Sequence, residues 1–178
     1  MSQAIGKRGL HPTQIVVLAF GAAVALSTIV LLLPISSADG TSTDFVTALF
    51  TAVSAVCLTG LNVVDTGTYW SPFGQGAILA MIQAGGVGIV SFATVLGLLI
   101  SGRISLSDRL NTFAEAKIVG ADNVPKLLQR IILVYFGFEA ILATYLSLRL
   151  RFEYGHDWGY SIWHGTFHAI SAFNNGGF

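Results

Sequence analysis

The stretch ALFTAVSAVCLTGL, residues 48–61, returns 117 positions later as GTFHAISAFNNGGF, residues 165–178. The two stretches align without a gap, and each is a short apolar segment that ends in a glycine-containing turn. The identical pairs are Phe50 and Phe167, Ala52 and Ala169, Ser54 and Ser171, Ala55 and Ala172, and Gly60 and Gly177. Because internal repeats define architecture, this match predicts one structural unit that occurs twice.

Three long apolar segments, at residues 14–35, 73–100 and 127–148, flank the repeated stretches, and Glu139 lies well inside the third. At 1.5 Å per helical residue, about 20 residues cross the hydrocarbon core of a bilayer. Hydrophobic residues form 53% of the chain and charged residues 10%, whereas soluble proteins carry about 25% charged residues. The sequence therefore predicts an all-α membrane protein with three spans.

Basic residues gather on one side of these spans. Seven of the nine lie before the first span, between the second and third, or at the start of the third: Lys7, Arg8, Arg103, Arg109, Lys117, Lys126 and Arg130. The positive-inside rule makes that side cytoplasmic, so residues 1–13 and the connection 102–126 are expected there. Residues 36–71 contain three acids and no base, and we expect them outside.

Two apolar segments, at residues 45–56 and 162–173, are too short to span a bilayer. They are predicted to be re-entrant or buried helices, and Asp44 is placed to cap the first. The chain then divides into a first helix–pore-loop–helix repeat, 14–101, and an incomplete second repeat, 127–178, which contains an outer helix, a pore helix and a filter.

A short helix that enters the membrane and stops midway directs its partly negative C-terminal end at the bilayer centre, which favours a cation. The chain is then expected to return outward as a strand-like segment whose backbone carbonyls replace the hydration shell of an ion. Gly60 and Gly177 permit the unusual backbone angles this requires. Since neither turn holds an acid, selectivity would depend on carbonyls.

Three motifs carry a family resemblance: SAVCLTGLNVVDTGTYW at 54–70, IQAGGVGIVSFAT at 82–94 and FHAISAFNNGGF at 167–178. They resemble the Trk/Ktr/HKT superfamily of potassium transporters, in particular its KtrB-type membrane subunits. The resemblance implies four repeats around one pore, each with one filter segment, and places Gly60 and Gly177 at the selectivity position. The implied ion-binding residues are Val56, Cys57, Leu58, Thr59 and Gly60, then Phe173, Asn174, Asn175, Gly176 and Gly177.

The same resemblance implies a substrate and partners. The substrate is potassium, although members with serine in the first repeat admit sodium, and no covalently bound cofactor is implied. The implied partners are membrane lipid, a second copy in a homodimer and a cytosolic nucleotide-binding regulatory ring, in a bacterial plasma membrane. Since the family has four repeats, we expect this chain to be the N-terminal fragment of a longer transporter. Two copies that assemble one pore are the alternative.

Several residues allow two interpretations. The glycines of Gly85-Gly86-Val87-Gly88 fit close helix packing better than a nucleotide loop, because no strand precedes them. Glu139 is either functional or an acid satisfied by a neighbouring helix. His164 and His168 fit packing better than pH sensing. We expect Asn174 and Asn175 to brace the filter backbone.

Other function classes have less support. A non-conducting membrane protein, with the short helices as packing elements, is the main alternative. An enzyme is not expected, because the sequence has no Ser/His/Asp set, and its four histidines and single Cys57 lack metal-site spacing. The zero net charge gives no indication of a nucleic-acid partner.

Overall fold

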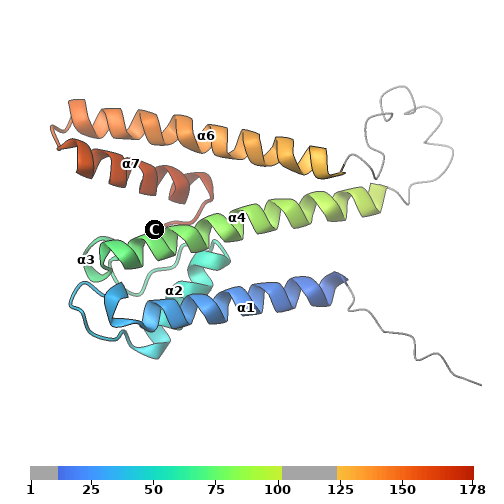
Figure 1. The fold of residues 1–178 in the computed structure, drawn as a ribbon, viewed down its shortest axis with the longest axis horizontal. Coiled ribbons are helices and arrows are strands. Elements are labelled where there is room, and N and C mark those ends of the chain that lie inside the picture. Colours follow the sequence, from blue (N-terminus) through green and yellow to red (C-terminus); the bar gives the residue numbers. More distant parts are fainter. Residues whose placement is uncertain (1–11, 102–123) are drawn as a thin grey trace, which may run out of the picture.

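The computed structural model describes residues 12–101 and 124–178 (Figure 1). In chain order, its helices are α1 (Pro12–Leu32), the 3-10 turn η1 (Pro34–Ser36), α2 (Phe45–Val56), α3 (Thr66–Tyr69), α4 (Pro72–Ser101), α6 (Val124–Phe152) and α7 (Trp158–Phe173). Helix α4 lies between α1 and α6 and contacts both, α2 packs on α1 and α4, and α7 packs on α6 and α4. An outer helix followed by a short helix thus occurs twice.

The three long helices fall on the three predicted spans, with different ends. Helices α4 and α6 contain apolar stretches long enough to cross a membrane, at Pro72–Ala93 and Leu128–Phe152. The apolar stretch of α1, Val16–Leu32, is shorter than these two. The full α1 has 21 residues and is about 32 Å long at the usual helical rise. It stops at Leu32, three residues before the predicted end, because Pro34 opens the 3-10 turn.

The short helices begin at aspartate caps. Asp44 Oδ2 accepts hydrogen bonds from the backbone N–H groups of Val46, at 3.0 Å, and Thr47, at 3.4 Å, so the predicted cap is confirmed. The second short helix begins at Trp158, four residues earlier than predicted. Asp157 caps it by accepting from the Tyr160 N–H at 3.0 Å. Helix α7 is therefore about one turn longer than α2.

Small side chains bring α1, α2 and α4 together into one core. Ala48, Ala52 and Ala55 of α2 are fully buried, as are Leu31 of α1 and Ile78 of α4. Alanine on the buried face lets the short helix approach its neighbours closely. This packing fixes the position of the C-terminal end of α2 between the two long helices.

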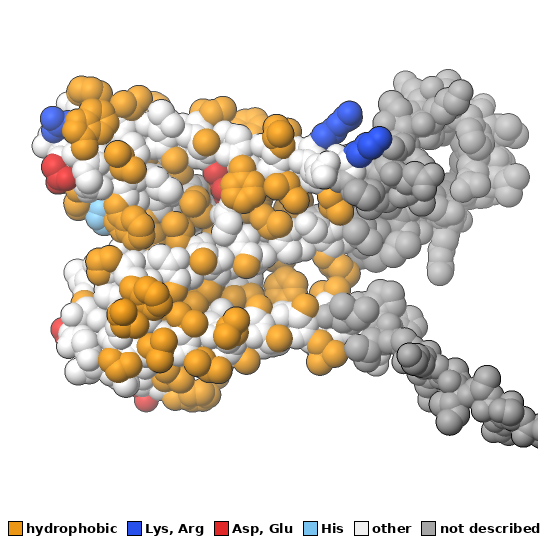
Figure 2. All heavy atoms as spheres, viewed as in Figure 1, with side chains coloured by type: hydrophobic (Ala, Val, Ile, Leu, Met, Phe, Trp, Pro, Cys, Tyr) orange, Lys and Arg blue, Asp and Glu red, His pale blue; other side chains and the backbone are white. Residues whose placement is uncertain are grey.

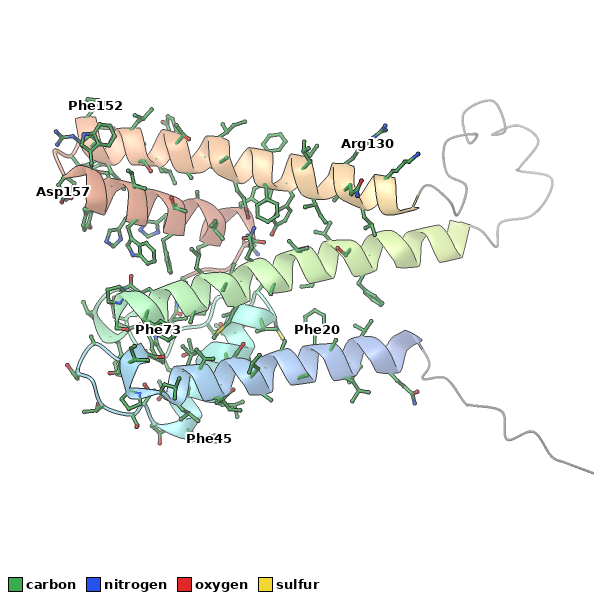
Figure 3. All side chains as sticks on the ribbon, viewed as in Figure 1. Phe20, Phe45, Phe73, Arg130, Phe152 and Asp157 are labelled. Atoms are coloured by element: carbon green, nitrogen blue, oxygen red, sulfur yellow. The ribbon has the colours of Figure 1, made fainter. Side chains whose placement is uncertain are left out.

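The outer surface is apolar along the helices (Figure 2). Val17, Leu133 and Phe152 expose 67%, 73% and 75% of their surface. Figure 3 places Phe152 and Asp157 at one end of the molecule and Arg130 toward the other end of α6. Exposed apolar flanks with charge at the ends are typical of helices in lipid. The predicted cytoplasmic segments fall mostly outside the described residues.

Candidate ion filter

The segments that follow α2 and α7 have the same backbone conformation. Leu58 and Asn175 both have φ of 57°, and Gly60 and Gly177 have φ of 72° and 70°. These pairs are separated by the same 117 positions as the sequence repeat. The expected strand-like form is therefore wrong in detail. Alternate residues adopt left-handed angles, which turn the chain after each short helix instead of extending it.

Hydrogen bonds repeat at the same offset. The N–H of Thr59 donates to Ser54 O at 3.0 Å, and the N–H of Gly176 donates to Ser171 O at 2.6 Å. The hydroxyl oxygen of Ser54 accepts from Leu61 N–H at 2.8 Å. Both serines are almost fully buried. We call these hydrogen bonds a serine clamp, because they join the end of each short helix to the segment that follows.

The second clamp has the same geometry. The Ser171 hydroxyl oxygen accepts from Phe178 N–H at 3.0 Å, and its proton is donated to Phe178 O at 3.0 Å. In the first repeat, Thr59 Oγ1 adds a bond to Ser54 Oγ at 3.1 Å. The serine that both repeats share therefore has a structural role: it holds the backbone where the chain turns after each short helix.

The two turns meet at their glycines. A Cβ built on Gly177 would lie 2.6 Å from Gly60 Cα and 3.1 Å from Gly60 O, and one on Gly60 would lie 3.1 Å from Gly177 Cα. Only glycine fits this approach at positive φ. Asn62 Nδ2 also donates to Gly177 O at 3.1 Å. Two segments far apart in the sequence are therefore joined at the positions the repeat singles out.

Helix α4 supports both turns through adjacent glycines. A Cβ on Gly85 would collide with the carbonyl oxygen of Val56 at the end of α2. A Cβ on Gly86 would collide with Asn174 Oδ1 and with Tyr135 Oη. The interpretation of these glycines as packing residues is confirmed, since each permits contact with a different repeat.

The turn carbonyls are available to a ligand. Among hydrogen bonds between described residues, none is accepted by the carbonyl oxygens of Cys57, Leu58, Thr59 or Gly60, nor by those of Asn174, Asn175 or Gly176. Gly177 O differs, because Asn62 occupies it. Carbonyl oxygens in irregular backbone are suitable ligands for a dehydrated alkali cation.

A polar network buries the side chain of Asn174. Its Nδ2 donates to Glu139 Oε1 at 2.8 Å and to Ile170 O at 2.9 Å, and Tyr135 Oη donates to its Oδ1. Gln83 Nε2 donates to Glu139 Oε2 at 2.7 Å. Glu139 is thus satisfied by neighbouring elements, and the Asn174 side chain is held by α4, α6 and its own helix.

The predicted site residues fall into two groups. Val56 and Phe173 are the last residues of α2 and α7, so only their carbonyls belong to the turns. The Phe173 ring packs edge-on against Tyr135, with centroids 5.0 Å apart. The remaining predicted residues, 57–60 and 174–177, form the two turns. Sequence reasoning missed Asn62 as a contributor to this site.

Two histidines and a tyrosine have adjacent rings at the start of α7. The ring of Tyr160 lies between His156, at 4.3 Å, and His164, at 4.0 Å, as measured between ring centroids. No cluster of metal-ligating side chains occurs within residues 12–101 and 124–178.

The clamps lead to a testable prediction. Ser171→Ala in the full-length protein removes the partner of the partly buried Phe178 N–H, which costs about 0.5–1.5 kcal/mol. We expect a lower melting temperature for the purified full-length protein, and a similar loss for Ser54→Ala. The matched control is Thr144→Ala, since that exposed hydroxyl only donates to Ala140 O of its own helix at 2.7 Å. Wild-type melting temperatures in both serine variants would contradict the clamp.

Comparison with known proteins identifies relatives along almost the whole chain. A family model described as TrkH, cation transport protein, matches residues 6–178. Ktr system potassium uptake protein B of Bacillus subtilis is 38% identical over 167 residues, which cover 94% of this chain and 37% of that protein. The protein of the same name from Vibrio alginolyticus is 37% identical over 169 residues, covering 93% of this chain and 35% of its own length.

The name of a third relative includes two ions. Potassium/sodium uptake protein NtpJ of Enterococcus hirae is 34% identical over 178 residues, which cover 100% of this chain and 39% of that protein. The chain therefore spans between 35% and 39% of the length of these three relatives.

Proposed function

Because the chain belongs to the TrkH family of cation transport proteins, we propose that it contributes to a membrane pore for potassium uptake. Two of the filter segments would be residues 56–60 and 173–177. The observation that carries the proposal is the repeated turn, in which left-handed backbone and free carbonyls recur and two glycines touch. The names of the relatives support potassium as the ion.

The mechanism follows from the ends of the short helices. Helices α2 and α7 direct their partly negative C-terminal ends toward the two turns, which lowers the energy of a cation there. Turn carbonyls replace water around the ion, so the ion is bound without an acidic ring and weakly enough to leave. The serine clamps and the α4 glycines hold these carbonyls in place, because a pre-organised site need not be ordered when the ion arrives.

Since the chain spans 35–39% of the length of these relatives, the proposed pore needs more repeats than this chain holds. We propose a pore of four such repeats. Residues 14–101 would form the first repeat and residues 127–178 part of the second. We propose that residues 1–13 and the connection 102–126 face the cytoplasm of a bacterial cell, and the basic residues in these segments support that orientation. A homodimer and a cytosolic nucleotide-binding ring at that face complete the proposed assembly.

A selectivity measurement tests this function. Gly60→Ser in the longest reading frame that contains this chain is expected to weaken discrimination against sodium, because serine adds a side chain where the two turns meet. Initial rates of potassium and sodium uptake, measured in the same cells, give the ratio. An unchanged ratio, with normal amounts of protein in the membrane, would remove Gly60 from the filter.

Sodium is the competing substrate, and one relative is named for both ions. This chain has glycine at both selectivity positions, Gly60 and Gly177. A wild-type ratio near one would favour the broader substrate, whereas a clear preference for potassium supports the first proposal.

A further inference from the structure

A buried carboxylate, that of Glu139, lies behind the second turn, and the proposed function gives it no role. Glu139 is 4% exposed, in the middle of an apolar stretch of α6. Ionisable groups at such depth are costly and are retained where they serve a site or an ion path. Both of its oxygens accept amide hydrogens, one from Gln83 of α4 and one from Asn174 at the end of α7. Three elements thus meet at one side chain.

The network fixes the orientation of the Asn174 amide. Tyr135 Oη donates to its oxygen, while its nitrogen donates to Glu139 and, at 3.4 Å, approaches Gln83 Oε1. A flipped amide would bring the Asn174 oxygen against two acceptors, Glu139 Oε1 and Ile170 O. The side chain therefore has one satisfied position.

Asn174 transmits that position to the filter. It is the C-cap of α7, and its N–H donates to Ile170 O at 3.0 Å. Its own carbonyl is the first of the second turn, and the left-handed Asn175 follows directly. Gly177, three residues after Asn174, contacts Gly60 of the first turn. A displacement of the Asn174 side chain would therefore act on the backbone that leads to this contact.

The two repeats differ at this point. The position that matches Asn174 in the first repeat is Cys57, whose side chain is exposed. The first turn is held instead by the extra bond of Thr59 to Ser54. The polar network is therefore specific to the second repeat and is not required to form the turn itself.

We propose that Glu139, Gln83 and Tyr135 are positioning residues that set the ion selectivity of the second filter segment through Asn174. The inference rests on the proposed function and deepens it. A shift of α4 relative to α6 would pass through the Gln83–Glu139 bond to Asn174 and change the spacing of the filter carbonyls. Selectivity, rather than the amount of folded protein, is the property that this network controls.

An exchange of side chains tests this inference. Gln83→Glu brings two carboxylates to hydrogen-bond distance of each other, and Glu139→Gln leaves at least one pair of like groups opposed in every orientation of the amides. The double variant Gln83→Glu/Glu139→Gln restores every bond with one donor reversed: the amide at 139 donates to the carboxylate at 83, and Asn174 still donates to the oxygen at 139. It also keeps one negative charge. Gln129→Glu, at an exposed position of α6, is the matched control.

Potassium and sodium uptake by the full-length transporter is measured per folded molecule in the membrane. Each single variant is expected to lower the potassium-to-sodium ratio about tenfold, within the coupling range of buried polar neighbours. The exchange is expected to return the ratio to within about twofold of wild type. The control should leave the ratio unchanged.

Three outcomes contradict the inference. Single variants that keep the wild-type ratio would reduce the network to a structural role, even if they lower the amount of folded protein. An exchange that fails to recover the ratio would show that the Gln83–Glu139 bond does not carry the effect. A wild-type protein without potassium uptake in the same cells would contradict the proposed function itself, and so the two failures are distinguished by one measurement.

Discussion

Gly177→Ala is expected to lower potassium uptake by the full-length transporter more than tenfold. The added Cβ would lie 2.6 Å from Gly60 Cα, a backbone atom of the opposite turn that has no flexible end to move. Overpacking of this kind costs about 1–3 kcal/mol, and left-handed angles cost a non-glycine residue about 1–2 kcal/mol more. The two turns must separate, which moves the carbonyls that bind the ion. Initial uptake rates at equal membrane amounts measure the effect.

Gly155 supplies the control for this prediction. It also has a positive φ, 72°, but a Cβ there meets no atom within 4 Å. Gly155→Ala therefore carries the backbone strain without the collision, and uptake should remain close to wild type. Equal losses in the two variants would mean that strain alone, and not the contact between the turns, explains the defect.

Gly85→Ala is expected to destabilise the protein by about 1–3 kcal/mol, because the new methyl group collides with the Val56 carbonyl. Either α2 moves away from α4 or the end of α2 distorts, and both changes displace the first turn. Thermal unfolding of the purified full-length protein in detergent measures the loss, and uptake should fall with it.

The matched control is Gly137→Ala on α6, where a Cβ meets nothing within 4 Å. Alanine is about 1 kcal/mol more favourable than glycine in a helix interior, so this variant should be at least as stable as wild type. If Gly85→Ala melted at the same temperature as Gly137→Ala, the close approach of α4 to α2 would be wrong.

The long helices and the first short helix could be predicted because their signals are local. Residues 45–56 were bounded correctly, since Asp44 precedes an unbroken apolar segment and a cap needs only its own first turn. Helix α7 starts earlier than predicted because its first turn, which contains Trp158 and Tyr160, is aromatic and polar instead of aliphatic. An apolar window does not detect such a turn.

The contacts of the site could not be predicted for a different reason. Asn62 bonds to Gly177 and Gln83 to Glu139 across large separations in the sequence. Nothing in the residues around an asparagine or a glutamine identifies a partner on another helix. The repeat identified Ser54, Ser171, Gly60 and Gly177, but their hydrogen bonds and the glycine contact depend on how α4 joins the two repeats.

Growth of a bacterium that lacks potassium uptake, on medium low in potassium, tests the central claim most directly. The host would express the longest reading frame that contains this chain, the 178-residue chain alone, or the long form with Gly177→Ala. Growth is expected with the long form only, and both the short chain and the glycine variant should fail at equal amounts in the membrane. No growth with the long form, or equal growth with Gly177→Ala, would contradict a potassium filter built from these two turns.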